Sequence, residues 1–330
     1  MSDMTTNPAR NGAPLLQVDT LVKSFGALRA VDGVSLELNH GEILGVVGES
    51  GCGKSTLAKT IFGLIPATSG RVTYDGRTIT GLSDREMRKI RREIQFVFQD
   101  PYASLNPRMT VFDLISEPWV IFPDLVPRAE WKSRVAALLE RVGLNAADAG
   151  RYPHQFSGGQ RQRIGIARAL AMSPRVLICD EPVSALDVSV QAQVINLLTD
   201  LRADLGISLI FIAHNLQIVR HISDRIAVMY LGKVVETGTW DEIYDRATHP
   251  YTQALISAIP DPDPALAQSR ILLQGDVPNP ANPPSGCRFR TRCWKATELC
   301  AREMPDLKIR QDTDHPSACH FAEHRKLVQA

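Results

Sequence analysis

Hydrophobic and polar positions alternate in the first part of the chain, which is the pattern of half-buried β-strands. Residues 16–18 and 34–38 alternate in this way, whereas residues 42–47 form an apolar run that leads into a glycine. Such a run is typical of a strand buried on both faces. The dipeptide Asp75-Gly76 within residues 71–79 is a hairpin signal. The region from about residue 15 to residue 81 is therefore predicted to consist of strands and turns.

Between about residues 83 and 173 the pattern changes to helical spacing. Charged and apolar residues recur at this spacing most clearly over residues 130–142. Pro118, Pro123 and Pro127 are predicted to break the stretch between helices. We interpret this region as a mostly helical insert.

Strand-like runs return after this insert and alternate with helices. Residues 176–179 and 208–213 are continuous apolar runs, and residues 188–205 between them have helical spacing. Strand–helix alternation of this kind favours a parallel α/β sheet. The centre of the fold is therefore predicted to be such a sheet.

Beyond His249 the sequence becomes rich in proline and then in cysteine. Prolines cluster between residues 260 and 284, and the tail carries four cysteines. This change predicts a linker followed by a small module. The predicted organisation is a disordered N-terminus (1–14), a main domain (15–258) with a helical subdomain at about 100–172, and a C-terminal extension (259–330).

The composition is that of an ordinary globular protein. Of 330 residues, 44% are hydrophobic and 22% are charged, and the net charge is +1. These values exclude a disordered, collagen-like or coiled-coil chain, and the small net charge argues against nucleic acid as a partner. No apolar run approaches the roughly 18–20 residues of a membrane helix, and residues 1–14 have no apolar signal core. The chain is predicted to be cytosolic, with any contact to a membrane made through a partner.

Residues 48–55 read G-E-S-G-C-G-K-S and match the phosphate-binding pattern G-x-x-x-x-G-K-[S/T] in full. Glycines let successive N–H groups face the phosphates, and the following helix contributes its positive end. Lys54 is expected to neutralise the β- and γ-phosphates, and Ser55 to bind Mg²⁺. The alternative is a glycine-rich turn with an exposed lysine. The predicted nucleotide-binding residues here are Gly48, Glu49, Ser50, Gly51, Cys52 (as a spacer), Gly53, Lys54, Ser55 and Thr56.

Two adjacent carboxylates, Asp180 and Glu181, follow the apolar run at residues 176–179. In an open parallel sheet, ligands bind beyond the carboxyl ends of the strands. Asp180 is therefore expected near Mg²⁺ and Glu181 near the γ-phosphate, where it would polarise the attacking water. The alternative is an acidic cap at which Asp180-Glu181-Pro182 begins a turn, and the phosphate-binding loop argues against it.

Ser157, Gly158, Gly159 and Gln160 precede a helix-compatible run over residues 161–172. A serine followed by two glycines exposes N–H groups at a helix start and forms a second anion site. Two phosphate-binding features in one chain suggest a ligand held between two chains. An ordinary serine N-cap explains this segment equally well.

Six short motifs together resemble the ATP-binding cassette (ABC) ATPases. The resemblance runs from about residue 15 to residue 250 and implies a parallel sheet core, an antiparallel β subdomain and a helical subdomain, followed by a small cysteine-bearing C-terminal module. It also implies ATP and Mg²⁺ as ligands, with two ATP molecules sandwiched head to tail in a dimer. The motifs are GESGCGKST (48–56), FQDP (98–101), FSGGQRQR (156–163), LICDEP (177–182), SALD (184–187) and IAHN (212–215).

The resemblance also assigns roles to single residues. Phe25 matches the aromatic that stacks on adenine, with core packing as the alternative. Gln99 matches the glutamine that senses Mg²⁺ and the γ-phosphate, with a polar strand end as the alternative. Residues 157–159 would contact ATP on the opposite subunit, and Asp187 would couple the two sites. His214 matches the switch histidine. The residues expected to act in hydrolysis are therefore Lys54, Gln99, Glu181 and His214. The expected Mg²⁺ ligands are Ser55, Gln99 and Asp180.

Three longer segments resemble the oligopeptide/dipeptide importer ATPases within this family: FQDPYASLNP (98–107), RYPHQFSGGQ (151–160) and HPYTQAL (249–255). Residues 275–293 resemble that subfamily's C-terminal extension. The resemblance implies an ATPase subunit that powers peptide uptake, peripheral at the cytoplasmic face of the inner membrane. Its implied partners are a second similar ATPase subunit, two membrane permease subunits and an extracytoplasmic solute-binding protein. The alternatives are import of a nickel chelate or an oligosaccharide, and a non-transport ABC ATPase acting on ribosomes or DNA.

The four tail cysteines are Cys287, Cys293, Cys300 and Cys319, and their spacing lacks the C-x-x-C pairs of common zinc sites. The subfamily resemblance implies a 4Fe–4S cluster rather than zinc on these residues. His315 and His320 are alternative ligands near Cys319. Four reduced cysteines that bind nothing are the remaining alternative, and disulfides are disfavoured in the cytosol.

Overall fold

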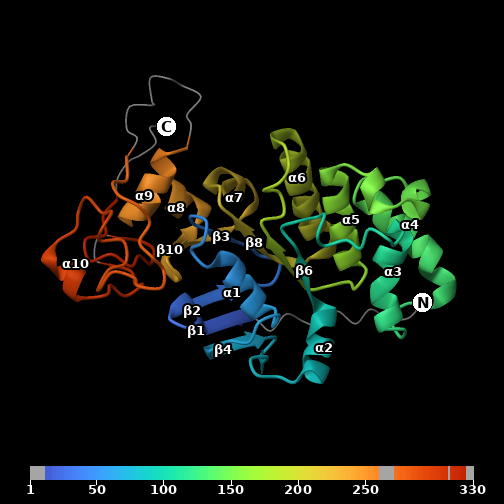
Figure 1. The fold of residues 1–330 in the computed structure, drawn as a ribbon, viewed down its shortest axis with the longest axis horizontal. Coiled ribbons are helices and arrows are strands. Elements are labelled where there is room, and N and C mark those ends of the chain that lie inside the picture. The colour runs from blue at the N-terminus through green and yellow to red at the C-terminus, as the bar shows by residue number, and fades with distance from the viewer. Residues whose placement is uncertain (1–11, 260–270, 311–312, 325–330) are drawn as a thin grey trace.

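The computed structural model describes residues 12–259, 271–310 and 313–324 (Figure 1). Most of the N-terminus that was expected to be disordered, residues 1–11, lies outside the described residues. So do residues 260–270, which begin the expected linker. In the described part of the chain, no helix combines the length and the apolar character that crossing a bilayer requires.

A six-stranded sheet forms the centre of the fold, in the order β10-β9-β3-β8-β7-β6. Strands β9, β3, β8, β7 and β6 are parallel to their neighbours, and β10 pairs with β9 antiparallel. Every residue of β3, β7 and β8 is buried, which confirms the predicted parallel α/β sheet. The strands are β3 Ile43–Val47, β6 Ile94–Val97, β7 Val176–Asp180, β8 Ser208–Ala213, β9 Arg225–Tyr230 and β10 Lys233–Thr239.

Strand β6 is an exception within residues 83–173, which were interpreted as a mostly helical insert and which contain helices α2 (Asp84–Glu93) to α5 (Gly158–Leu170). It pairs in parallel with β7 and ends the main sheet. The strand is four residues long, and Gln95 interrupts its apolar run. A run this short, next to a helix-forming segment, carries too little periodicity to be recognised as a strand.

A smaller antiparallel sheet has the order β2-β1-β4-β5. Its β4–β5 hairpin turns at Asp75 and Gly76, whose φ angles of 47° and 76° are both left-handed. This is the turn geometry that such a dipeptide favours, and it confirms the predicted hairpin. The strands are β1 Leu16–Phe25, β2 Leu28–Leu38, β4 Ser69–Tyr74 and β5 Arg77–Thr78.

Helices cover both faces of the main sheet, and α3, α4 and α5 gather at one end of the molecule (Figure 1). Helix α6 spans the residues predicted for it, 188–205. The α-helices are α1 Lys54–Ile61, α2 Asp84–Glu93, α3 Val111–Ile121, α4 Trp131–Arg141, α5 Gly158–Leu170, α6 Val188–Leu205, α7 Leu216–Ile222, α8 Trp240–Asp245, α9 Pro250–Ser257 and α10 Glu298–Arg302. The 3₁₀ helices are η1 Arg128–Glu130, η2 Ala146–Gly150 and η3 Pro153–Gln155.

Pro118 was expected to separate two helices, but it lies inside α3. Proline in a helix interior costs about 3 kcal/mol, so tertiary packing must outweigh this cost. Leu114, Ile115 and Trp119 of the same helix are at most 1% exposed, and the Trp119 indole donates to the carbonyl of Ala171 at 2.9 Å. Burial of its apolar face thus stabilises α3 despite the proline. Tertiary packing of this kind is the usual source of helix stability in proteins.

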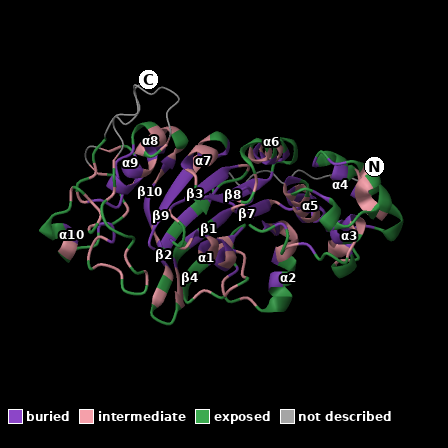
Figure 2. Cartoon of the chain, turned by 45° about the horizontal axis from the view of Figure 1, so that its top comes forward, coloured by how far each residue is buried: buried purple, intermediate pink, exposed green. Residues whose placement is uncertain are grey.

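The hydrophobic core is divided by the main sheet into two clusters. Within β7, Leu177 and Cys179 belong to one cluster, whereas Val176 and Ile178 belong to the other. This is the alternation of a strand whose side chains point to opposite faces. Figure 2 shows the buried strands in the middle and the exposed residues on the outer helices and loops.

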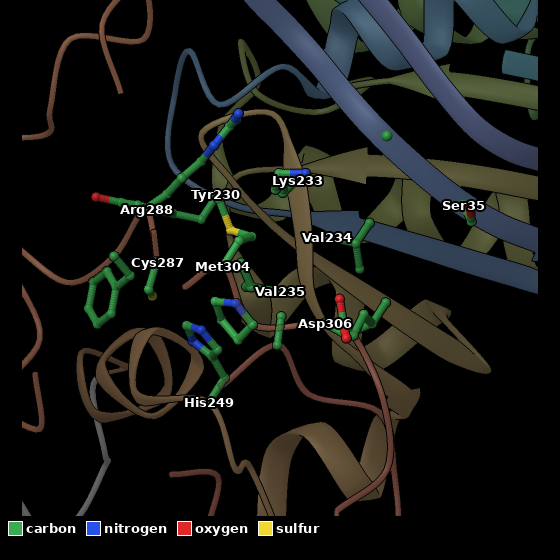
Figure 3. Close-up of a pocket in the computed structure, with 15 residues that line it drawn as sticks. Ser35, Tyr230, Lys233, Val234, Val235, His249, Cys287, Arg288, Met304 and Asp306 are labelled. Carbon is green, nitrogen blue, oxygen red and sulfur yellow. The ribbon is translucent and has the colours of Figure 1, made fainter. Parts of the chain in front are cut away.

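The C-terminal extension packs against β9 and β10 (Figure 1). Phe289 is 1% exposed, and its ring centre lies 5.3 Å from that of Tyr230 and 5.4 Å from that of Tyr251. The N–H of Ala318 donates to the carbonyl of Val235 at 2.7 Å. Between the extension, β2 and β10 lies a pocket of about 310 Å³ (Figure 3). The extension thus shares the core of the main domain.

A buried ion pair also joins the extension to β10. His315 Nε2 lies 2.8 Å from Glu236 Oε1, and the side chains are 1% and 0% exposed. Burial by itself would lower the pKa of His315 and raise that of Glu236. Their hydrogen bond and opposite charges outweigh burial, so the pKa of His315 is raised and that of Glu236 is lowered. Both shifts favour the charged pair.

We expect His315→Gln to destabilise the protein by about 3 kcal/mol near pH 6.5, because Glu236 would keep a buried charge without its cation. A histidine whose pKa is raised on folding stabilises fully below its unfolded pKa, and this contribution is lost as pH rises through the folded pKa. The difference in melting temperature between wild type and His315→Gln should therefore shrink as the pH rises above about 6.5. A difference that stays constant as the pH rises would contradict the prediction.

Candidate functional site

The predicted phosphate-binding loop connects β3 to α1 and depends on glycine at two positions. A Cβ at Gly48 would lie 2.1 Å from the carbonyl oxygen of Met229, and one at Gly53 would lie 2.0 Å from that of Ala30. Both glycines also have left-handed φ angles, 155° and 106°. Only glycine combines this backbone freedom with the absence of a side chain. The loop is therefore curled tightly against the β1–β2 and β9–β10 regions.

Lys54 begins α1 and points back into the loop. Its Nζ donates to the carbonyls of Gly48 at 2.8 Å and Glu49 at 3.1 Å. The side chain is 4% exposed and lies 3.8 Å from a carboxylate oxygen of Glu181. The ammonium group is thus held at the mouth of the loop, where a phosphate could replace the two carbonyl contacts.

Ser55 and Asp180 meet at the carboxyl end of β7. Ser55 Oγ donates to Asp180 Oδ1 at 2.7 Å. Burial is the main cause that raises the pKa of Asp180, and the neighbouring carboxylate of Glu181 adds to it. A bound cation would favour the ionised carboxylate. Hydroxyl, carboxylate and amide oxygens are the hard donors that Mg²⁺ prefers, so Ser55, Asp180 and Gln99 fit this ion.

Glu181 lies at the centre of the predicted hydrolytic residues. The Gln99 amide donates to Glu181 Oε2 at 3.0 Å, and His214 Nδ1 lies 3.6 Å from the same oxygen. Glu181 has a left-handed φ of 45° directly after β7, and its N–H donates to the carbonyl of Ile212 at 3.0 Å. The structure thus brings Lys54, Gln99, Glu181 and His214 together from four separate segments.

Phe25 lies beside this cluster with its ring half-exposed, so it is not a core residue. Lys23 Nζ lies 4.7 Å above the ring. The ring and the phosphate-binding loop line one pocket of about 290 Å³. An exposed aromatic face next to a phosphate-binding loop could stack on a nucleotide base. Other lining residues of this pocket are Ser50, Gly51, Gly53, Lys54, Ser55, Thr56, Gln99 and Glu181.

Cys52 lies inside the loop but is buried, with 4% of its surface exposed. Burial raises the pKa of its thiol, despite the nearby charge of Lys54. A buried, protonated thiol is a poor nucleophile. Its position agrees with the interpretation of Cys52 as a spacer.

Ser157 caps α5 rather than lying in the pocket that contains Lys54. Ser157 Oγ accepts from the N–H of Gln160 at 3.3 Å, and Gln160 Oε1 accepts from the N–H of Ser157 at 3.0 Å. A Cβ at Gly159 would lie 2.2 Å from Val190, whereas Gly158 is less restricted. Figure 1 places α5 at the end of the molecule away from α1. Within one chain, these four residues do not join the pocket at the phosphate-binding loop.

Asp187 caps α6 and is exposed. Its Oδ1 accepts from Ser189 Oγ at 2.7 Å and from the N–H of Val190 at 2.9 Å. These hydrogen bonds lower the pKa of the Asp187 carboxyl group, that from Ser189 most strongly. The residue is therefore a charged helix cap at the surface.

The described residues give no support to the expected 4Fe–4S cluster. Cys287, Cys293, Cys300 and Cys319 are free thiols. Burial, with neighbouring thiols, raises the pKa of Cys287 to about 11 and that of Cys319 to about 12. Over residues 12–259, 271–310 and 313–324, no three histidine, cysteine or acidic residues are grouped so as to hold a metal ion. In the described part of the chain, these residues therefore show no arrangement that fits a cluster or a zinc ion.

The two histidines considered as alternative ligands have other partners. His315 uses both ring nitrogens, Nε2 toward Glu236 and Nδ1 toward Asp314 at 2.7 Å. His320 Nε2 lies 3.1 Å from the carbonyl oxygen of Glu303. Neither ring is therefore directed at a shared site with Cys319.

Sequence reasoning missed two contacts of the site. Arg292 pairs with Glu49 of the loop at 2.8 Å, and Pro280 lines the pocket with Phe25. Both residues belong to the C-terminal extension. No local pattern could have revealed contacts to residues more than 200 positions earlier in the chain.

Comparison with known proteins identifies the family. The ABC transporter family pattern matches residues 31–184, and the pattern of the oligopeptide/dipeptide transporter C-terminal region matches residues 235–300. The chain is 57% identical over 283 residues to the oligopeptide transport ATP-binding protein OppF of Escherichia coli K12, covering 85% of each chain. It is 51% identical over 302 residues to the oligopeptide transport ATP-binding protein AppF of Bacillus subtilis 168, covering 91% of each.

Solved structures show the same fold. CbiO1 of Clostridium perfringens, part of the ABC transporter complex CbiONQ, superposes with a TM-score of 0.64 at 32% identity, covering 70% of this chain and 90% of that one. The dimeric, post-hydrolysis ATP-binding cassette MJ0796 bound to ADP and phosphate superposes with a TM-score of 0.63 at 31% identity, covering 68% and 98%. The chain therefore belongs to the ABC transporter family, in the group of the oligopeptide transport ATP-binding proteins.

Proposed function

We propose that this chain is the ATP-hydrolysing subunit of an importer that carries oligopeptides or dipeptides across the cytoplasmic membrane. The observation that carries the ATPase activity is the position of Glu181, hydrogen-bonded to Gln99 and within 4 Å of both Lys54 and His214. The 57% identical relative is an oligopeptide transport ATP-binding protein, which supports peptides as the solute. Nickel chelates and oligosaccharides are alternative solutes that the transport test below separates.

The geometry supports a mechanism in which the chain positions water against the γ-phosphate. Lys54 exchanges its two carbonyl contacts for phosphate oxygens. Ser55, Asp180 and Gln99 would hold Mg²⁺, which when bound neutralises charge on the β- and γ-phosphates. Glu181 accepts a proton from the attacking water as the P–O bond to the γ-phosphate breaks. The products are ADP and phosphate.

We propose a dimer in which residues 157–160 complete the site of a second, similar ATPase subunit. The backbone N–H groups at the start of α5, at Gly158 and Gly159, are oriented for a phosphate ligand. They lie outside the pocket at the phosphate-binding loop of their own chain. Asp187, exposed at the start of α6, would couple the two sites. Two ATP molecules would then be held between the subunits.

A groove between α2, α3, α5 and β6 is the proposed docking site for a membrane permease subunit. It has a volume of about 500 Å³, with Phe98, Ile121 and Phe122 among its apolar lining residues. Phe98 is adjacent to Gln99, whose amide contacts Glu181. An apolar cytoplasmic segment of a permease subunit that binds in this groove would contact Phe98. It would therefore lie next to Gln99, a member of the hydrolytic cluster. This arrangement would place the subunit at the cytoplasmic face of the membrane, with a solute-binding protein delivering the peptide outside.

The test is a pull-down from native membranes with tagged Glu181→Gln protein and ATP. Two multi-span membrane subunits and a second ABC ATPase are the expected partners. Adding Ile121→Asp should reduce recovery of the membrane subunits by about tenfold or more, because a charge would be buried in an apolar groove. Val120→Asp is the matched control, since Val120 is adjacent and exposed but does not line the groove.

The outcomes separate the alternatives. Ribosomal or DNA-bound proteins without a membrane subunit would contradict the importer and favour a non-transport ATPase. Equal loss of partners with Val120→Asp and Ile121→Asp would contradict the groove as the docking site. The recovered complex, reconstituted in vesicles with its solute-binding protein, should take up a labelled peptide and not a nickel chelate or an oligosaccharide.

A further inference from the structure

The C-terminal extension contacts the phosphate-binding loop through a bidentate ion pair. The Arg292 guanidinium donates to both carboxylate oxygens of Glu49, at 2.8 and 3.2 Å. The Arg292 side chain is 9% exposed, and that of Glu49 is 27% exposed. A planar guanidinium that binds two carboxylate oxygens fixes orientation as well as charge. The pair therefore holds Glu49, the second residue of the loop, in one position.

Further contacts fix the surroundings of this ion pair. The N–H of Glu49 donates to the hydroxyl of Tyr251 at 2.9 Å, and Tyr251 is fully buried. Arg288, four residues before Arg292 and buried, donates to the side chain of Asp32 and to the carbonyl of Leu231. Figure 3 shows Arg288 near Tyr230, on the side of the pocket formed by the extension. The extension is thus anchored to β2 and to the end of β9 as well as to the loop.

Glu49 brings a negative charge into the phosphate-binding loop. Glu49 directly follows Gly48, and its carbonyl accepts a hydrogen bond from Lys54 Nζ at 3.1 Å. An unpaired carboxylate on this residue would repel the triphosphate and compete for the lysine. Arg292 compensates that charge and directs the carboxylate toward the extension.

We infer that Arg292 is a positioning residue for ATP binding, which acts through Glu49. The inference rests on the proposed function, because it assigns to the extension a part in the nucleotide site. By this inference, the C-terminal extension takes part in ATP binding. The ligand concerned is a nucleoside triphosphate, and the effect depends on its negative charge.

The test measures ATP binding to the full-length protein by calorimetry, and ATP hydrolysis in parallel. Arg292→Gln should weaken ATP binding on the order of tenfold and raise KM with little change in kcat, because Glu49 loses its counter-charge. The weakening should be larger at low salt, since salt screens the repulsion. The double variant Glu49→Gln/Arg292→Gln should bind ATP more tightly than Arg292→Gln alone, because the repelling charge is gone.

Arg290→Gln is the matched control. Arg290 lies two residues earlier and donates to the carbonyl and hydroxyl of Ser285 rather than to Glu49, so this variant should bind ATP like wild type. Unchanged ATP affinity in Arg292→Gln would overturn the inference. A double variant as weak as Arg292→Gln would also overturn it, because the defect would then be structural and independent of charge. Wild-type protein that bound no ATP would overturn the proposed function and the inference with it.

Discussion

Glu181→Gln is expected to bind ATP normally and to hydrolyse it about 10²- to 10⁴-fold more slowly than wild type, the range for loss of a general base. Glutamine keeps an oxygen that can accept the hydrogen bond from Gln99, which in the structure is 3.0 Å long. It cannot accept a proton from water. ATP would therefore persist between two subunits and hold them together.

Phosphate release and light scattering with ATP measure the two parts of this prediction. The variant should release phosphate slowly and shift from monomer to dimer when ATP is added. Glu140→Gln is a suitable control, because Glu140 is an exposed carboxylate on α4. Wild-type turnover in Glu181→Gln would remove Glu181 from the role of general base.

Lys54→Ala is expected to weaken ATP binding on the order of 100-fold or more and to leave no measurable hydrolysis, since charge-assisted hydrogen bonds to phosphate contribute about 1.5–3 kcal/mol each. The Lys54 ammonium lies at the mouth of the loop and contacts two of its carbonyls. Its loss removes the cation that would meet the β- and γ-phosphates.

Calorimetric titration with ATP checks the loss of binding, and a phosphate-release assay checks the loss of hydrolysis. Lys132→Ala removes an exposed lysine of α4 and should behave as wild type. Retained hydrolysis in Lys54→Ala would refute the assignment of residues 48–55 as the phosphate-binding loop.

Elements with a strong local pattern could be predicted from the sequence. The apolar run at residues 208–213 became β8, and the helical pattern at 188–205 became α6 with the same bounds. The Asp75-Gly76 turn is likewise set by local backbone preference. Strand β6 and the continuation of α3 through Pro118 depend on partners distant in the chain, which local patterns do not contain.

In the candidate site, too, some contacts could be predicted from the sequence and others could not. Lys54, Glu181 and His214 each follow a strand of the parallel sheet, so their meeting at one edge follows from topology. The contact of Ser157 with a site on another chain stays a prediction. A single chain contains only half of the proposed interface. The intervals between the tail cysteines do not tell whether these residues hold a metal, since intervals do not determine how the side chains are arranged.

The ion pair between Glu49 and Arg292 also sets an order of events during synthesis. The two residues are 243 positions apart, and a ribosome adds about 5–20 residues per second. The loop is therefore made about 12 to 50 seconds before its arginine exists. During that interval Glu49 has no counter-charge from the extension. The nucleotide site would reach its final form only after nearly the whole chain has left the ribosome.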